Sequence, residues 1–296
     1  MEEEIIPDIK PNYLNIIALQ NYFAVLFFWG ENMKRLFILL FCIPFILSGC
    51  NSQSVSTKNV PLKDEEYYNS LSNKTQGWGF QRTDDGPRFS EDQIRQMADY
   101  HCIYKEDTDE KSIYLTFDEG YENGYTSIIL DTLREKGVPA AFFVTAPYVK
   151  GNSDLIKRMA KEGHIIGNHT VNHPSLPSVK DIDTLQKELF ELDRLIYGIC
   201  SQKSRFLRPP KGEYSERTLA ITNDLGYTNV FWSQAYVDWN DNVSAQEALS
   251  KITKNLHSGC VLLLHAVSKG NADALKDVIE YAQKQGYTFK SLNEYR

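Results

Sequence analysis

The chain has 296 residues, of which 42% are hydrophobic and 12% aromatic, which is enough apolar material for one domain of roughly 200 to 250 residues plus additional segments. Its net charge of -7 and its pI near 5.5 exclude an electrostatic nucleic-acid binder, because such proteins concentrate Lys and Arg. The sequence also contains no internal repeat and no glycine-rich phosphate loop.

Residues 33–50 predict a lipoprotein-type signal. They begin with Met-Lys-Arg, continue with an apolar run over residues 36–47, and end with Leu-Ser-Gly-Cys at residues 47–50. This last stretch resembles the lipobox of bacterial lipoproteins, in which the cysteine, here Cys50, becomes lipidated and forms the new N-terminus. We therefore expect an extracytoplasmic protein that is anchored to the cell membrane as a lipoprotein through Cys50.

A plain transmembrane anchor is the alternative to this signal. The apolar run over residues 36–47 is short for a bilayer span, but residues 22–29 upstream are also apolar, so an anchor that starts earlier stays open. Residues 1–32 are expected to be an upstream segment of doubtful status rather than a domain, since their apolar stretch is interrupted ahead of a better signal.

Residues 51–111 are expected to form a tether followed by an N-terminal extension. Residues 51–74 are rich in Ser, Asn, Thr and Lys, a composition that suits a tether holding a domain off a membrane surface. Further on, Ser90 and Gln93 have the spacing of a capping box, which predicts a short helix that begins after Ser90.

From residue 112 to residue 296 the pattern alternates between short apolar runs and longer amphipathic ones, which predicts a βα domain with a mainly parallel sheet. The predicted strands are Ile113–Phe117, Ala140–Thr145, Ile165–Gly167, Arg205–Leu207, Asn229–Trp232 and Val261–Leu264. The predicted helices are Ser153–Lys161, Ile182–Tyr197, Glu216–Asp224, Ala245–Leu256 and Ala272–Lys284.

Distinctive polar clusters follow several of these strands. They read DEG, NHTVNHP, RPPKG, VDW and LLLH in chain order. Functional residues at the carboxyl ends of many strands are typical of a barrel, whereas a doubly wound sheet concentrates its site at one switch point. The α/β domain is therefore predicted to close like a barrel.

Two histidines and a carboxylate pair predict a metal site. His169 and His173 lie four residues apart, so on a helical turn both imidazoles can meet one ion. Asp118 and Glu119 end a strand side by side, and buried carboxylates are seldom found unless they are paired or bound to a metal. The alternative for the histidines is a solvated loop, and His265 at the end of its apolar strand can also be read as a capped core residue.

Two further motifs place charged groups near such a site. Arg208 precedes two prolines that fix the backbone, so its guanidinium suits the orientation of a carboxylate. Asp238 stands beside Trp239, an acid next to a flat apolar wall that suits a histidine and a sugar ring. By itself Trp239 says little, because tryptophan is more often part of a core than of a site.

In order, TFDEG, HTVNH, RPPKG, VDW and LLLH resemble the five motifs of the polysaccharide deacetylases of the NodB-homology type, carbohydrate esterase family 4. The resemblance spans residues 113–296, and its five short motifs agree in order and spacing. TFDEGYENGYT, together with the upstream GWGFQR, is similar to the branch that deacetylates N-acetylmuramic acid on the way to the muramic-δ-lactam of bacterial spore cortex.

The resemblance implies a distorted (β/α) barrel over residues 112–296 and metal-assisted hydrolysis of an N-acetyl group in peptidoglycan glycan strands. It implies that His169 and His173 hold a divalent ion, expected to be zinc, and that Asp118 is the general base. His265, oriented by Asp238, would protonate the departing amine. Arg208 would fix the carboxylate end of the site, and the main-chain N–H near Lys211 would help to hold the oxyanion.

Two positions depart from the family pattern. Glu119 stands where the family has the aspartate that completes the metal triad, so it is expected to ligate less directly, through water, or not at all. Lys211 replaces an aromatic residue of the third motif, and a basic group there suits the lactyl carboxylate of muramic acid. The substrate-side residues are thus predicted to be Lys211 and Trp239.

Three alternatives to the muramic assignment stay open. The chain is alternatively a deacetylase of N-acetylglucosamine residues in peptidoglycan or chitin oligomers, an enzyme that acts on acetylated xylan, or a non-catalytic lipoprotein that only binds cell-wall glycan. The presence of both Asp118 and His265 argues against the last of these, because a binding module needs neither a base nor an acid. We expect a monomer that has no nucleic-acid partner.

Overall fold

We describe the protein from a computed structural model, in which residues 63–83, 86–239 and 243–296 are described. The predicted upstream segment 1–32 and the predicted signal 33–50 with Cys50 lie outside these ranges. Within them, no helix has both the length and the apolar character that crossing a membrane requires.

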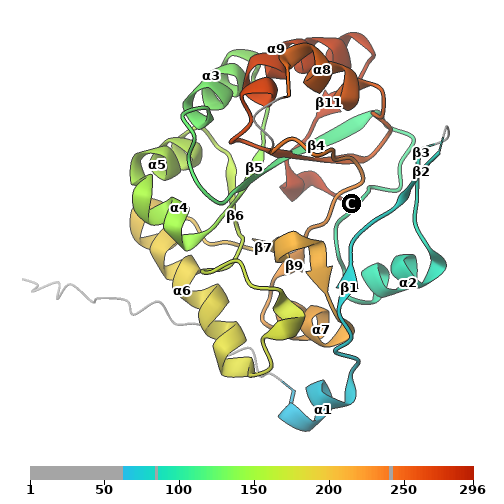
Figure 1. Ribbon diagram of the computed structural model, residues 1–296, viewed down its shortest axis with the longest axis vertical. Helices are drawn as coiled ribbons and strands as arrows, with labels where there is room; N and C mark the ends of the chain where they lie inside the picture. Colours follow the sequence, from blue (N-terminus) through green and yellow to red (C-terminus); the bar gives the residue numbers. More distant parts are fainter. Residues whose placement is uncertain (1–62, 84–85, 240–242) are drawn as a thin grey trace, which may run out of the picture. The chain divides into compact units, whose positions relative to one another are not determined.

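A seven-stranded parallel sheet forms the centre of the described part (Figure 1). Its strands lie in the order β10-β4-β5-β6-β7-β9, and β11 also pairs with β4. The bounds are β4 Ser112–Glu119, β5 Ala141–Val144, β6 Ile165–Asn168, β7 Phe206–Leu207, β9 Thr228–Asn229, β10 Cys260–His265 and β11 Thr288–Phe289. Because the strands are parallel, their carboxyl ends meet at one edge of the sheet, where the polar motifs follow them.

The segment that follows β9 draws the two ends of this sheet toward each other. Val230 N donates to the carbonyl of Leu207 in β7 (2.8 Å). A few residues later, Ser233 N donates to the carbonyl of Val261 in β10 (3.0 Å), and Leu263 N donates to the carbonyl of Gln234 (2.9 Å). The α/β fold is therefore a curled parallel half-barrel, which confirms the barrel-like curvature that the sequence predicts.

Side chains of β4 alternate between the two faces of the sheet, as the pleat requires. Ile113, Leu115 and Phe117 belong to the core between the sheet and the helices. Tyr114 belongs to a second cluster inside the curled sheet, together with Phe143, Val230 and Val261. Thr116 and Asp118 share the inner face with Tyr114, whereas Glu119 follows Phe117 on the helix side.

The helices cover the outer face of the sheet (Figure 1). They are α3 Thr126–Lys136, α4 Ala146–Gly151, α5 Ser153–Lys161, α6 Ile182–Cys200, α7 Glu216–Asp224, α8 Ala245–Thr253 and α9 Lys269–Lys284, with 3-10 turns η1 Leu176–Ser178, η2 Pro210–Gly212 and η3 Leu292–Glu294. The predictions for α5 and α7 are confirmed with the same bounds. The helices α3 and α4 were not predicted.

An N-terminal extension packs against this domain. It contains α1 Glu65–Ser70, β1 Gln76–Gly77, β2 Gln81–Thr83, β3 Gly86–Arg88 and α2 Glu91–Asp99. The helix α2 begins after Ser90, whose hydroxyl accepts from Gln93 N while the Gln93 side chain accepts from Ser90 N, so the predicted capping box is confirmed.

The structure corrects the predicted extent of the tether, which was expected to reach residue 74. Asp64 caps α1, and Tyr68 on this helix is fully buried and donates a hydrogen bond to Asp224 (2.8 Å). The polar composition of residues 51–74 gives no sign of this packed helix, because one buried aromatic residue with a polar partner is enough to fix a short helix.

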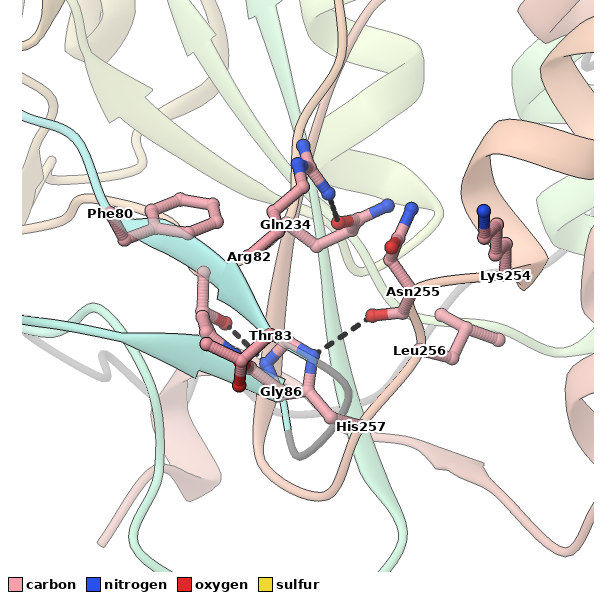
Figure 2. Close-up of a pocket in the computed structure, with 11 residues that line it drawn as sticks. Phe80, Arg82, Thr83, Gly86, Gln234, Lys254, Asn255, Leu256 and His257 are labelled. Carbon is pink, nitrogen blue, oxygen red and sulfur yellow. Dashed lines mark hydrogen bonds between the residues drawn. The ribbon is translucent and has the colours of Figure 1, made fainter.

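Further along, the extension contacts the segment after β9. Trp78 Nε1 donates to the carbonyl of Trp232 (2.8 Å), and Arg82 Nη1 donates to Gln234 Oε1 (2.7 Å). Figure 2 shows Arg82 and Gln234 at a cavity of about 260 Å³ between the β2–β3 hairpin and the segment after α8. Of the predicted site residues that the structure describes, none lines this cavity.

Candidate active site

A buried arginine organises the carboxyl edge of the sheet. Arg208, directly after β7, is fully buried, and its Nη1 donates to Asp118 Oδ1 (2.7 Å). Its other donors reach Thr116 Oγ1 (2.9 Å) and the carbonyl of Val230 (3.1 Å). The guanidinium also lies 4.2 Å from the centroid of the Phe143 ring. Each of its three nitrogens thus donates a hydrogen bond, and together these bonds hold one orientation toward Asp118.

Asp118 is ionised at neutral pH in this environment. Burial by itself favours the neutral acid, but Arg208, His169 and His265 outweigh burial, so the pKa of Asp118 lies below its usual value. Its Oδ2 lies 3.6 Å from His169 Nε2. A carboxylate that is charged, held by Arg208 and next to an imidazole suits the predicted role of a base.

His169 and His173 lie together beside Asp118. The ring centroids are 4.7 Å apart, and His169 Nδ1 is 2.8 Å from the carbonyl oxygen of Arg208. Because a carbonyl only accepts, Nδ1 carries the hydrogen and Nε2 keeps a free lone pair that faces Asp118.

Both imidazoles are neutral near pH 7. Burial lowers the pKa of His169 to about 4, and burial also lowers the pKa of His173. Neutral imidazoles are the usual ligands of zinc and similar divalent ions, and His169 also has the hydrogen-bonded second nitrogen that is typical of such ligands. These two residues therefore fit the divalent ion that the sequence predicts.

Glu119, the third predicted ligand, lies on the opposite face of β4 from Asp118. Its side chain is fully buried and neither carboxyl oxygen has a hydrogen-bond partner. Burial, followed by the nearby charges of Glu122 and Asp118, raises its pKa well above the usual value. Over the described residues, no set of three or more His, Cys, Asp and Glu side chains is arranged to hold an ion. A ligand role for Glu119 stays a prediction.

His265 and Asp238 form a tight pair on the other side of Asp118. His265 lies opposite Asp118 in the β10–β4 register. Its Nδ1 is 2.7 Å from Asp238 Oδ1, and its backbone N donates to Asp238 Oδ2 (2.8 Å). Burial favours the neutral ring, but the Asp238 carboxylate outweighs burial and raises the pKa of His265. This pairing suits a proton donor.

Asn271, in the first turn of α9, completes the support of Asp238. Its Nδ2 donates to Asp238 Oδ2 (2.5 Å) and to the carbonyl of His265 (3.2 Å). The hydroxyl of Tyr236 in turn contacts Asn271 Oδ1. Neither residue was predicted, because no short motif marks them.

Trp239 and Lys211 lie at the open side of the site. Trp239 is 53% exposed, and its ring is 5.2 Å from the His265 ring, centroid to centroid, in an edge-on arrangement. Lys211 is exposed, has a left-handed backbone (φ 61°), and contributes a positive charge that lowers the pKa of His173. Both predicted substrate residues are thus accessible beside the histidines.

Replacement of Asp238 tests the pairing with His265. In Asp238→Asn the imidazolium loses its carboxylate, so the pKa of His265 falls. If protonated His265 is the acid, the alkaline limb of the pH–kcat profile should move to lower pH, and turnover near neutral pH should fall by roughly 10² or more. The profile of purified enzyme measures this. An alkaline limb at the wild-type position would show that His265 is not the acid.

Comparisons with known proteins identify relatives of this chain. A family model described as polysaccharide deacetylase matches residues 105–230. The peptidoglycan-N-acetylmuramic acid deacetylase PdaA of Bacillus subtilis is 42% identical over 258 residues, which cover 86% of this chain and 92% of PdaA.

Two solved structures are also similar. The structure of Bacillus subtilis PdaA, described as a family 4 carbohydrate esterase, matches with a TM-score of 0.74 and 44% identity over 76% of this chain and 98% of that one. A family 4 carbohydrate esterase from Bacillus anthracis matches with a TM-score of 0.66 and 43% identity over the same shares, 76% and 98%. The chain therefore belongs to the polysaccharide deacetylase family, carbohydrate esterase family 4, and is a hydrolase of amide bonds.

Proposed function

We propose that this enzyme removes the acetyl group from N-acetylmuramic acid residues of peptidoglycan in a metal-dependent reaction. The observation that carries the substrate assignment is the exposed side chain of Lys211, three residues after Arg208, whose positive charge lowers the pKa of His173. The similarity to PdaA of Bacillus subtilis, whose name states this substrate, supports the same assignment.

Asp118, His169 and His173 act on the water and the substrate carbonyl. The two imidazoles would hold the divalent ion, zinc in our proposal, which polarises the amide carbonyl when bound. Asp118, kept ionised and oriented by Arg208, takes a proton from the attacking water. The water oxygen thereby forms a bond to the carbonyl carbon.

His265 acts on the leaving group. Asp238 holds the ring and raises its pKa, so the protonated ring is available to donate. As the carbon–nitrogen bond breaks, His265 passes its proton to the departing nitrogen, which leaves as an amine while acetate forms. The base and the acid come from neighbouring strands in register, so both stand at the same carboxyl edge of the sheet.

The substrate assignment rests on charge complementarity. Muramic acid carries a lactyl carboxylate that N-acetylglucosamine lacks, and this carboxylate is free once the stem peptide is removed. An exposed lysine ammonium is a suitable partner for such a carboxylate. Two exposed aromatic residues near the strand ends, Tyr121 at 58% and Trp239 at 53%, suit contact with sugar rings. We further propose that the freed amine is the one that closes on the lactyl carboxylate in the muramic-δ-lactam of spore cortex.

Lys211→Ala should lower kcat/KM on amidase-treated peptidoglycan, with little change on chitin oligomers, because only the first substrate loses an ion pair. A drop of about tenfold corresponds to one ion pair of moderate strength. Lys203→Ala is the matched control, since Lys203 is exposed and precedes β7 rather than following it. Lys211→Arg should retain most of the preference.

The substrate assignment fails if Lys211→Ala loses the same factor on both substrates. It also fails if the wild type acts faster on chitin oligomers than on peptide-stripped glycan. Either result would favour N-acetylglucosamine as the substrate while leaving the deacetylase chemistry intact.

A further inference from the structure

The loop that carries both histidines, residues 169–173, has an energetically unfavourable backbone conformation at two residues. Thr170 (φ 68°) and His173 (φ 56°) both lie in the left-handed region, which side chains with a Cβ seldom adopt. Thr170 is also β-branched and fully buried. Such a conformation persists only where surrounding contacts determine it, so the partners of this loop decide where the two imidazoles lie.

Every backbone N–H from His169 to His173 has a partner. His169 N donates to the carbonyl of Val144 (3.0 Å), and Val171 N donates to the carbonyl of Glu188 (3.0 Å). The other three N–H groups use side chains, with Thr170 bonded to Asn168 Oδ1 (2.8 Å), Asn172 to Glu188 Oε2 (2.9 Å) and His173 to Thr170 Oγ1 (2.9 Å). The backbone N–H groups of the loop are thus all bonded, to β5, to the last residue of β6, to the loop itself and to α6.

Asn168 has only one possible orientation in this network. Its Nδ2 donates to Asp193 Oδ1 (2.7 Å) and to the carbonyl of Leu189 (2.9 Å), both on α6. Its Oδ1 is thereby turned toward Thr170 N. Asp193 is itself held by the hydroxyl of Tyr227, which donates to Oδ2 (2.6 Å). The Asp193 carboxylate on α6 therefore fixes the orientation of the Asn168 side-chain amide. That amide in turn fixes the backbone turn between the two histidines.

Glu188 supplies a second attachment five residues earlier on α6. Its carboxylate accepts from both the backbone N and the side-chain Nδ2 (2.6 Å) of Asn172. Each histidine is thus preceded by an asparagine that binds α6, Asn168 before His169 and Asn172 before His173. The Asp193 attachment is more deeply buried than the Glu188 attachment, which is exposed.

We propose that Asn168 and Asp193 are positioning residues that fix the two imidazoles in a ligating geometry, with Glu188 as a weaker second support. The proposal rests on the assignment of His169 and His173 to a divalent ion. Neither Asn168 nor Asp193 touches the substrate or the ion in this scheme; both act through the backbone of residues 169–173.

The first test measures metal binding rather than activity. In Asn168→Asp the donor to Asp193 is lost and two carboxylates face each other, so Zn²⁺ affinity measured by calorimetry on metal-free full-length protein should fall by roughly 10- to 100-fold. The visible absorption spectrum of bound Co²⁺ should change as well, since it reports ligand geometry. Glu191→Gln is the matched control, because Glu191 is an exposed acid on α6 between the two attachments.

A pair of substitutions at Asp193 separates positioning from folding. Asp193→Asn keeps an oxygen acceptor for Asn168, so its Zn²⁺ affinity should stay within a few-fold of the wild type. Asp193→Leu has no acceptor, so its Zn²⁺ affinity should fall further than that. Amide hydrogen exchange at residues 170–173 gives a readout that needs no metal: exchange should be faster in Asn168→Asp and in Asp193→Leu, and unchanged in Glu191→Gln.

The outcomes distinguish the positioning role of Asn168 and Asp193 from the assignment of His169 and His173 to a metal ion. Wild-type Zn²⁺ affinity, Co²⁺ spectrum and loop exchange in Asn168→Asp would overturn the positioning role while leaving the metal site in place. Faster loop exchange in Asn168→Asp, in a protein that binds no Zn²⁺ even as wild type, would overturn the metal site while retaining the control of the loop by Asn168. Equal losses in Asp193→Asn and Asp193→Leu would overturn the role of the Asp193 acceptor.

Discussion

Asp118→Asn should lower kcat by roughly 10² to 10⁴, the usual contribution of a positioned general base. The amide has nearly the same shape and still accepts from Arg208, but it cannot take a proton from water. Its effect should appear on muramic and chitin substrates alike, because the base acts on the water and not on the sugar. Steady-state rates on both substrates measure this.

The same substitution should also destabilise the fold. Arg208 is fully buried, and in Asp118→Asn its charge has no counterion, a change that typically costs about 3 to 5 kcal/mol in buried pairs. Denaturant unfolding gives this value independently of activity. Asp154→Asn is the control, since that side chain is 94% exposed. A kcat within tenfold of the wild type, from a folded Asp118→Asn protein, would remove Asp118 from the role of base.

Arg208→Met should reduce both stability and activity, with a pH dependence of definite sign. In the wild type the pKa of Asp118 is depressed, so its ionised form stabilises the fold above the unfolded pKa, and this stability is lost as pH falls through the folded pKa. In Arg208→Met burial dominates, so the pKa of Asp118 rises above its unfolded value. The loss of stability should therefore be greatest near neutral pH, at about 3 to 5 kcal/mol, and should shrink on acidification.

The activity of Arg208→Met should follow the same titration. A base with a raised pKa is protonated over more of the pH range, so the acidic limb of the pH–kcat profile should move to higher pH. Arg208→Lys keeps the positive charge but not the planar guanidinium. The acidic limb of its pH–kcat profile should therefore lie between those of the wild type and Arg208→Met. Unfolding curves and pH profiles test both statements, and an unmoved acidic limb in Arg208→Met would show that Arg208 does not control Asp118.

Much of the sheet could be predicted from the sequence because its strands are short apolar runs between polar loops. The structure extends the predicted strand Ile113–Phe117 to Ser112–Glu119 and ends β9 at Asn229 rather than at Trp232. The second difference has a physical cause, since Val230 makes the last hydrogen bond to β7 and the chain from Ser233 onward hydrogen-bonds with β10.

The helix α3 was missed because its start carries no sequence signal. Tyr125 occupies the N-cap without a side-chain cap bond, and Ile128 on the solvent side is 45% exposed. The apolar residues of α3 therefore do not follow the spacing of a single apolar helix face.

Parts of the site were predictable and parts were not. The motifs predicted the residues that the structure brings together, with Asp118, His169 and Arg208 in mutual contact. The placement of Glu119 follows from strand alternation, because adjacent residues of β4 point to opposite faces. Asn271 and Asp193, in contrast, act on partners 33 and 25 residues away in the chain, and no local pattern marks such contacts.

Mass spectrometry of muropeptides tests peptidoglycan deacetylation most directly. Purified protein is incubated with amidase-treated and with untreated peptidoglycan, and the products are digested and fragmented to locate each acetyl group. The expected result is the loss of one acetyl group from muramic residues of the amidase-treated material, with the neighbouring N-acetylglucosamine intact and no such loss with Asp118→Asn. Acetyl loss confined to glucosamine residues, or no loss from either sugar, would contradict the muramic deacetylase function.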